Sequence, residues 1–367
     1  MKILIISQNT CPLQSPRAFR TQELSEELVR QGHEVTLYTV HGGIDYSEYE
    51  KKTGILMKNI KPLLPIESND GKRRYSVFQR LLYHFFHRIF FYPEVDFHFR
   101  VDSILKSETN IDLLITIAYP HTIHSGAAKS KLKHPRTFPK VWIADCGDPF
   151  YLNRFVNAPR YMERYERQWC EVADWISVPT EGSKEGYFPE YKDKICVIPQ
   201  GFDFSKTPIA RYTKNSVITF VFCGSVYPGK RDIRSFMDFL LRWDKPYKFK
   251  LLLRSPLDNK YEIESNHQIE YVVGKNRKEV IWECSKADFL INIKNPNNTQ
   301  TPSKLIDYGI SGRPVLDVSH VFCEQKQFDE FYRGDYHNQH YILNLEHYKI
   351  KTVAGQFIEL ANNLKKY

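Results

Sequence analysis

Short runs of apolar residues, separated by amphipathic stretches, organise the first part of the chain. The first run is Lys2–Ser7 (KILIIS), and residues 17–31 follow it with apolar side chains at helical spacing. Gly32 ends that helix, and the next run, EVTLYTV, begins at Glu34. Continuous apolar runs indicate strands buried on both faces, and strand, helix and strand together make a βαβ unit. The pattern therefore predicts a parallel sheet with crossover helices.

The pattern continues with further apolar runs and restarts after a break. Residues 199–216 contain two prolines and no clear periodicity, so we interpret part of this stretch as a linker. Helices are expected between the strands, with one near 233–242 and a closing one at about 352–366. The remaining strands are predicted at 111–118, 140–145, 175–180 and 194–199 before the break, and at 217–225, 248–255, 269–274 and 288–294 after it.

This organisation predicts an α/β protein with two Rossmann-like parallel-sheet domains that face a cleft. A length of 367 residues also favours two cores over one. Parallel sheets bind ligands at the carboxyl ends of their strands, so we expect the chemistry in the loops that follow the strands. The predicted parts are residues 1–200 (first domain), 201–212 (linker), 213–347 (second domain) and 348–367 (a C-terminal helix).

Charge adds an anionic partner to this picture. The 52 basic and 43 acidic residues give a net charge of +9, which suits a nucleotide, a nucleic acid or an anionic lipid. No aromatic–basic motif typical of nucleic-acid recognition occurs, which disfavours that partner. The seven cysteines are scattered without a C-x-x-C pair, so their spacing suggests neither a zinc site nor a disulfide framework. The apolar runs are too short for a signal peptide or a membrane span.

Two arginines begin the first predicted helix. The loop before them, QNTCPLQSP, contains no glycine and so is no G-x-G-x-x-G fingerprint, which weighs against an NAD enzyme. Arg17 and Arg20 lie three residues apart, and cations are disfavoured beside a helix N-terminus. We therefore expect them to hold an anion, with a solvated basic face as the alternative.

A loop in the second half suits a phosphate. In CGSVYPGKRD, Gly224 and Gly229 let the backbone approach a ligand closely. Lys230 and Arg231 follow at positions where they can grip a phosphate group. The signal is weak by itself, because a glycine-containing turn with two basic residues is common.

The stretch TPSKLIDYGISGRPVL reads as a short helix that carries a cation and a carboxylate. Thr301 suits the N-cap, and Lys304 and Asp307 follow, one turn apart. Helix amides and the lysine suit a diphosphate, and the carboxylate suits two ribose hydroxyls, so the helix fits a nucleoside diphosphate. The alternative is an exposed ion pair worth only a few tenths of a kcal/mol.

The order and spacing of these pieces resemble the retaining glycosyltransferases of the two-Rossmann-domain (GT-B) type, family four. In the second half, VIPQGFD is similar to the family's interdomain signature, CGSVYPGKR to its phosphate loop, and ADFLINIKNPNNTQTPSKLIDYGISGRPVL to its donor-binding helix. In the first half, GHEVTLYT is similar to the family's second strand. SPRAFRTQEL, FFYPEVDFHFR and WIADCGDPF resemble the bacterial polysaccharide-biosynthesis branch. The resemblance covers nearly the whole chain, and it implies that the C-terminal helix crosses back to the first domain.

The resemblance implies roles for individual residues. The implied catalytic residues are Lys230, Lys304, Asp145 and Asp148, the lysines at the leaving diphosphate and the aspartates toward the sugar or acceptor. The implied donor-binding residues are Gly224, Ser225, Arg231, Thr301, Ser303 and Asp307, the last on the ribose. The implied acceptor or anion side consists of Arg17, Arg20 and His124, although a lone histidine such as His124 is more often structural. No metal and no cofactor is implied, because the nucleotide-sugar is itself the substrate.

Two departures from the family pattern leave rival interpretations open. The family often has an arginine where this chain has Ser225, and a glutamate where it has Thr299. Arg231 is a candidate replacement for the first charge. The resemblance implies a retaining, hexosyltransferase-type enzyme that moves a sugar, from a UDP-sugar by preference, to a glycan or lipid-linked acceptor in surface polysaccharide synthesis. The rivals are a sugar-nucleotide epimerase of the same fold and a non-catalytic partner subunit.

One further stretch indicates where such an enzyme works. Residues 72–91 interleave five Lys or Arg residues with many aromatic ones, as in segments that lie on anionic bilayers. A core helix with a basic outer edge is the alternative. With the resemblance, this stretch predicts a cytoplasmic protein held peripherally on the inner face of the membrane.

Overall fold

The chain folds into two compact units in the computed structural model. Unit 1 comprises Met1–Phe202 and His347–Tyr367, and unit 2 comprises Asp203–Glu346. The described residues are 1–64, 66–70, 78, 86, 91–153, 159–226, 232–253, 256, 267–294, 304–319, 324–341 and 344–363.

Unit 1 is built on a seven-stranded parallel sheet with the order β3-β2-β1-β4-β5-β6-β7. The central strands are the apolar runs of the sequence, and every residue of β4 and β5 is buried, as a sheet covered on both faces requires. The strands are β1 (Lys2–Ser7), β2 (Glu34–Thr39), β3 (Leu56–Asn59), β4 (Leu113–Ala118), β5 (Val141–Cys146), β6 (Trp175–Val178) and β7 (Ile195–Val197).

Helices cover both faces of this sheet. Three of them contribute apolar side chains to the core on one face: α4 (Asp96–Ser107), α5 (Thr122–Lys133) and α6 (Met162–Val172). On the other face the core takes side chains from α1 (Pro16–Arg30) and α11 (Ile350–Asn363), and α2 (Ser47–Thr53) follows β2. Ser15 caps α1 by accepting a hydrogen bond from the Ala18 amide, and Pro16 occupies the first helical position.

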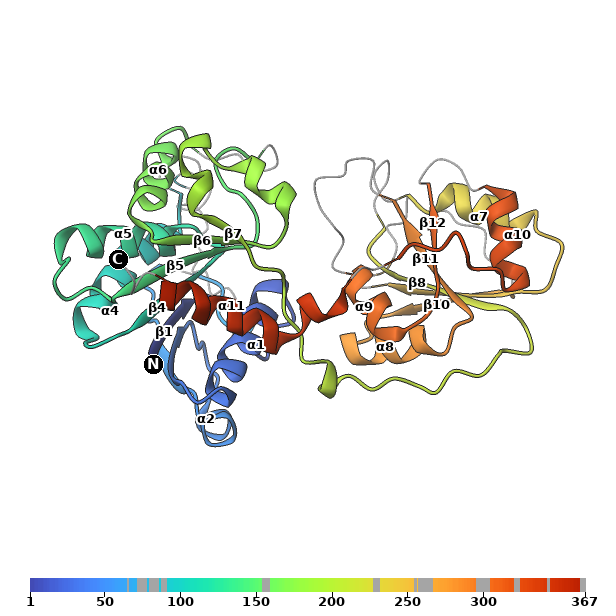
Figure 1. Ribbon diagram of the computed structural model, residues 1–367, viewed down its shortest axis with the longest axis horizontal. Helices are drawn as coiled ribbons and strands as arrows, with labels where there is room; N and C mark the ends of the chain where they lie inside the picture. Colours follow the sequence, from blue (N-terminus) through green and yellow to red (C-terminus); the bar gives the residue numbers. More distant parts are fainter. Residues whose placement is uncertain are drawn as a thin grey trace. The chain divides into compact units, whose positions relative to one another are not determined.

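The C-terminal helix completes the core of unit 1. Val353 and Phe357 of α11 are fully buried beside Leu24 and Leu28 of α1, and the two helices lie side by side (Figure 1). The chain returns to unit 1 next to the point where it left, because the Phe202 amide donates to the Tyr348 carbonyl at 2.8 Å. The predicted return of this helix to the first domain is confirmed.

Unit 2 repeats the architecture with a five-stranded parallel sheet in the order β10-β9-β8-β11-β12. Its strands are β8 (Thr219–Gly224), β9 (Lys248–Leu253), β10 (Ile269–Val273), β11 (Phe289–Ile293) and β12 (Val315–Val318). One face packs against α7 (Arg234–Leu241) and α10 (Gln325–Arg333), and the other against α8 (Arg277–Ser285) and α9 (Lys304–Ser311). Short 3-10 helices lie at Glu181–Gly186, Pro189–Lys194, Phe204–Lys206 and Leu345–Tyr348.

Residues 203–212, most of the predicted linker, are part of unit 2. Tyr212 donates from its hydroxyl to Asp288 at 2.6 Å, and the Arg313 guanidinium stacks 3.4 Å from the Tyr212 ring centroid. These contacts hold the stretch before β8 against the sheet. Among the described residues, no helix combines the length and the apolar character needed to cross a bilayer.

Candidate active site

A buried ion pair occupies the carboxyl end of β5 in unit 1. Arg20 of α1 donates from Nε and Nη2 to the two carboxylate oxygens of Asp145, at 3.0 and 2.8 Å, and Ser177 donates to the same carboxylate at 2.7 Å. Arg20 also donates to the carbonyls of Ile198 and Pro199. Burial acts to raise the pKa of Asp145, but the charge and hydrogen bonds of Arg20 outweigh it and hold the pKa below its ordinary value.

This pairing corrects two expectations. Arg20 is 3 % exposed and Asp145 2 %, so neither side chain presents an open charge to a ligand. The hydrogen-bond donors of Arg20 bond groups of unit 1. The chain itself therefore supplies the carboxylate that compensates the charge of Arg20. Arg20 and Asp145 therefore act as positioning residues that fix the start of α1 against the ends of β5 and β7.

Arg17 and Asp148 lie where solvent reaches them. Asp148 is exposed in the turn after β5, and Arg17 is half-buried in the first turn of α1. The Arg17 guanidinium lies against Gly147, where a Cβ atom would come within 1.6 Å of Nη2. Within the described part of the chain, this guanidinium has no hydrogen bond or ion pair. Gly147 thus makes room for a half-buried cation that is not paired with a carboxylate of the described residues, as an anion site requires.

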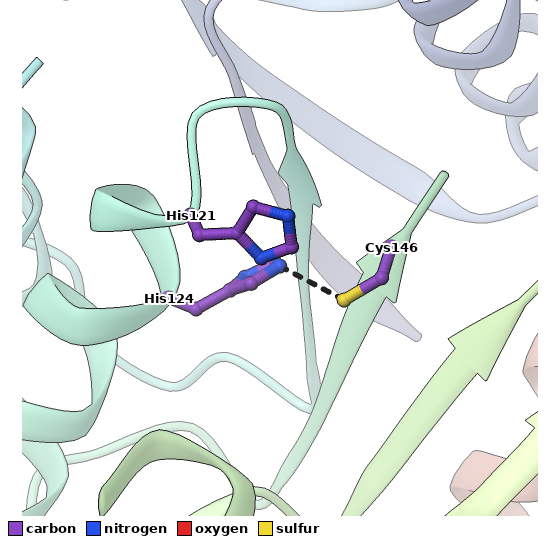
Figure 2. A group of neighbouring side chains, drawn as sticks. All are labelled: His121, His124 and Cys146. Carbon is purple, nitrogen blue, oxygen red and sulfur yellow. Dashed lines mark hydrogen bonds between the residues drawn. The ribbon is translucent and has the colours of Figure 1, made fainter. Parts of the chain in front are cut away.

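His124 is not at the surface, which agrees with a structural histidine and not with the acceptor-side role that the resemblance implies. It is fully buried in the first turn of α5, where Nδ1 lies 2.8 Å from Thr116 Oγ1 and Nε2 lies 3.3 Å from Cys146 Sγ (Figure 2). Burial lowers the pKa of His124 well below its ordinary value, so the ring is neutral. The ring is thus enclosed by the protein, with Thr116 and Cys146 as its polar neighbours.

In unit 2, Lys304 lies over the carboxyl end of β8. Its Nζ is 4.7 Å from the Phe222 ring centroid, and a Cβ atom at Gly224 would come within 1.7 Å of Nζ. Gly224 has φ 127°, a backbone conformation that favours glycine, so both its geometry and the space above it require this residue. The lysine that begins the described part of α9 is therefore held at the strand end where parallel sheets bind ligands.

Asp307 lies one turn further along α9 and pairs with Arg277. Nε and Nη2 of Arg277 both donate to Oδ1, at 2.8 and 2.6 Å. Burial raises the pKa of Asp307, although Arg277 and Lys304 act to lower it. Oδ2 receives no hydrogen bond from any described residue, so half of this carboxylate is left for further donors.

Arg277 is the residue of this site that sequence reasoning missed. It begins α8, whose start is fixed by a capping box in which Asn276 and Glu279 bond each other's backbone amides. The segment GKNRKE follows β10 directly, so it is one of the loops after strands that were expected to carry chemistry. The available signal was a cation in the first turn of a helix, the same signal that singled out Arg17 and Arg20.

The remaining predicted site residues are not all described. Ser225 follows Gly224 and is half-buried. Lys230, Arg231, Thr301 and Ser303 lie outside the described residues, so their roles stay predictions.

Comparison with known proteins gives a family and a fold. The family model of glycosyltransferase family 4 matches residues 19–206, slightly more than half of the chain. The search against curated proteins gives no match.

Solved structures with the same architecture are distant in sequence. The apo form of a lipopolysaccharide outer core galactosyltransferase, WaaB, aligns with a TM-score of 0.59 at 12 % identity, covering 100 % of both chains. A glycosyltransferase from Rickettsia africae aligns with a TM-score of 0.58 at 10 % identity, covering 99 % of this chain and 93 % of the other. A UDP-N-acetylglucosamine 2-epimerase candidate from Listeria monocytogenes aligns with a TM-score of 0.52 at 10 % identity, covering 100 % and 97 %.

At these identities the structural likeness establishes the fold alone, and the family model establishes the class. The two parallel-sheet units agree with the predicted GT-B architecture. This protein is therefore a glycosyltransferase that belongs to glycosyltransferase family 4.

Proposed function

We propose that the protein is a retaining glycosyltransferase that moves a sugar from a nucleotide-sugar, UDP-linked by preference, to a glycan or lipid-linked acceptor in surface polysaccharide synthesis. The observation that carries the donor side is Lys304, held over Gly224 at the carboxyl end of β8. Ligands of open α/β sheets bind at this edge, and a fixed cation there suits the diphosphate of a donor.

Lys304 has a direct chemical task in such a reaction. When the bond from the sugar to the donor breaks, negative charge develops on the departing diphosphate. A lysine already in place stabilises that charge without any reorganisation, and the amides at the start of α9 act in the same direction. The proposal assigns no metal ion to the leaving group, so donor affinity is expected to be the same with and without a chelator.

Asp307 completes the donor side by binding the nucleoside. Its Oδ2 is left to accept a ribose hydroxyl, while Arg277 holds Oδ1 and fixes the carboxylate in place. The acceptor side consists of Arg17 and Asp148, the two predicted residues of unit 1 that reach solvent. Arg17 would bind an anionic group of the acceptor, such as the phosphate of a lipid-linked sugar.

A ligand screen tests the donor assignment. Nucleoside diphosphates with different bases, and their sugars, are added one at a time to the protein, and the melting temperature is measured for each. UDP and a UDP-sugar should raise the melting temperature most, because ligands that bind the native state stabilise it. If no nucleoside diphosphate raises the melting temperature, the result favours the non-catalytic partner subunit. If the protein epimerises the sugar of the donor, using water in place of an acceptor, and transfers no sugar to a glycan, it is the epimerase.

Replacing Asp307 with alanine should weaken UDP binding while the fold stays intact. The loss of a hydrogen bond to a charged group costs about 1.5–3 kcal/mol, or roughly 10- to 150-fold in the dissociation constant measured by calorimetry. Asp329→Ala is the matched control, because Asp329 is 19 % exposed and paired with Lys245 at 2.7 Å, whereas Asp307 is 17 % exposed and paired with Arg277. Equal UDP affinity in both variants would remove Asp307 from the nucleoside site.

The proposal places the protein at the inner face of an anionic membrane, through residues 72–91. Nearly all of that stretch lies outside the described residues; of the three that are described, Phe78 is 68 % exposed, Phe86 is half-buried and Phe91 is buried. Each basic residue near such a surface contributes about 1 kcal/mol, and the attraction decays within a Debye length. The protein should therefore sediment with anionic vesicles at low salt and stay in the supernatant at high salt.

Charge reversal tests whether the vesicles bind this stretch or simply the net positive charge of the protein. Glutamate at Arg73, Arg74 and Arg80 should abolish sedimentation with the vesicles. Glutamate at Arg211, Lys214 and Lys326, three exposed basic residues of unit 2, changes the net charge by the same amount. This second triple variant should still sediment with the vesicles. Equal loss in both triple variants would show that net charge alone, and not this stretch, binds the vesicles.

A further inference from the structure

Three side chains that ligate metals converge at the carboxyl edge of the sheet in unit 1. His121 precedes α5, His124 lies in its first turn, and Cys146 ends β5. One potential ligand atom from each lies within 4.8 Å of the other two, and Figure 2 shows the two rings and the thiol pointing toward one another. All three residues are at most 4 % exposed. The chain spacing of the cysteines gave no hint of this group, because its members meet only through the fold.

Each imidazole is held through one ring nitrogen, which leaves the other for a ligand. Nδ1 of His124 bonds Thr116 Oγ1, an oxygen that also accepts a hydrogen bond from Trp142 Nε1 at 2.8 Å, so Nε2 faces Cys146. The His121 ring is hydrogen-bonded by the backbone of Asp148, yet its Nδ1 is buried with no hydrogen-bond partner among the described residues. Metal-bound histidines characteristically have this arrangement, with the outer nitrogen fixed by an oxygen.

Aromatic side chains enclose the group. His121 stacks on Phe150 with ring centroids 4.8 Å apart, and the centroid of Trp169 lies 4.8 Å from that of His124. A buried nitrogen without a partner is unfavourable here unless a ligand satisfies it.

We propose that His121, His124 and Cys146 bind one Zn²⁺ ion, with a fourth position left for water or another small ligand. Two imidazoles and a thiolate suit this borderline-soft cation, which takes nitrogen and sulfur ligands in a tetrahedral arrangement. The His124 Nε2–Cys146 Sγ distance of 3.3 Å is near the edge of a zinc tetrahedron, and all three ligand atoms lie within 4.8 Å of one another. Binding forms a metal–thiolate bond and releases the thiol proton to solvent.

The ion would join two segments that lie next to residues predicted for the acceptor side. Cys146 directly follows the buried Asp145, and His121 is bonded to the backbone of the exposed Asp148. A bound ion therefore fixes the turn after β5 to the start of α5. This site is separate from the donor residues of unit 2, so its failure leaves the donor assignment untouched.

Cobalt and zinc titrations of the full chain test the site. The purified protein is freed of metal with a chelator and titrated with Co²⁺, whose complexes with thiolate absorb through a sulfur-to-cobalt charge-transfer band. We expect that band to saturate at one ion per chain and to disappear when Zn²⁺ is added. Zn²⁺ should also raise the melting temperature of the metal-free protein.

Matched variants decide whether these three residues are the ligands. Cys146→Ala and His121→Phe should each weaken Zn²⁺ binding by at least about 100-fold, since even outer partners of a metal site cost roughly 10- to 100-fold. His121→Phe keeps an aromatic ring against Phe150. Cys170→Ala is the control, because this substitution removes a thiol that is also fully buried but lies outside the group.

Three results would overturn the proposal. The first is a cobalt complex without a thiolate band, and the second is equal zinc affinity in Cys146→Ala and Cys170→Ala. The third is an intense thiolate-to-copper band with Cu²⁺ together with no stabilisation by Zn²⁺, which assigns copper in place of zinc. Far-UV circular dichroism of each variant verifies that a loss of binding is not a loss of fold.

Discussion

Arg20→Ala is expected to destabilise unit 1 by about 3–5 kcal/mol, the usual cost of leaving one partner of a buried ion pair without the other. The substitution leaves the Asp145 carboxylate at 2 % exposure with only the Ser177 hydroxyl as a hydrogen-bond donor among the described side chains. Urea unfolding measures the loss. Hydrogen exchange then locates it, since the amides of β5 should lose protection while those of β8 in unit 2 keep theirs.

The loss of stability in Arg20→Ala should depend on pH, and its direction follows from the lowered pKa of Asp145. Arg20 holds the pKa of Asp145 below its unfolded value of about 3.9, against the opposing effect of burial. The stabilisation is therefore fully present above that unfolded value and disappears as the pH falls through the lower folded value. The difference in stability between wild type and Arg20→Ala should accordingly narrow below about pH 4.

Arg17→Ala is the control for this experiment. Arg17 lies one turn before Arg20 on the same helix and has no ion pair with the described residues, so its loss should cost less than about 1 kcal/mol. Equal destabilisation by the two alanine variants would contradict the assignment of Arg20 as the buried partner. A double replacement of Arg20 and Asp145 by apolar residues should recover part of the stability, because no charge is then left buried.

Lys304→Met is expected to lower kcat for sugar transfer by about 100- to 1,000-fold, or roughly 2.7–4 kcal/mol of transition-state stabilisation. Methionine keeps an unbranched side chain over Phe222 and removes only the charge that the leaving diphosphate needs. The measurement is the initial rate of transfer at saturating donor. Because the lysine acts on charge that develops as the bond breaks, kcat should fall more than donor affinity does.

Lys286→Ala should leave the rate unchanged. Lys286 is an exposed lysine of unit 2 that pairs with Glu283 at 3.3 Å, so it controls for the loss of one positive charge. Lys304→Arg should retain part of the activity, because it keeps the charge but not the compact ammonium group. Wild-type turnover by Lys304→Met at saturating donor would end the leaving-group role of Lys304.

The apolar runs were sufficient to predict the buried strands and the edge strands β7 and β10, but not the edge strands β3 and β12. β1 was predicted at Lys2–Ser7 and is observed there, because a run buried on both faces has no competing interpretation. β3 was missed, since this edge strand mixes the exposed Leu56 with polar residues. β12 was missed because the stretch 301–316 resembles a single short helix, whereas α9 ends at Ser311 and a strand begins at Val315.

The site shows why one local signal can have two meanings. Arg17 and Arg20 share a helix turn and a charge, yet Arg17 reaches the surface and Arg20 meets a carboxylate 125 residues away in sequence. A cation at a helix N-terminus indicates that a negative charge is nearby, but local spacing cannot say whether the chain or a ligand supplies it. Lys304 and Gly224 were each predicted separately, and only the fold shows that they touch.

The return of α11 to unit 1 has a consequence for folding on the ribosome. The N-terminal segment emerges first, but its core lacks Val353 and Phe357 until all of Asp203–Glu346 has been made. At synthesis rates of about 5–20 residues per second, this delay is on the order of ten seconds. During that interval the apolar stripe of α1, including Leu24 and Leu28, lacks its partner helix. The nascent chain thus presents a defined surface for chaperone capture, and unit 2, encoded without interruption, can complete its own fold first.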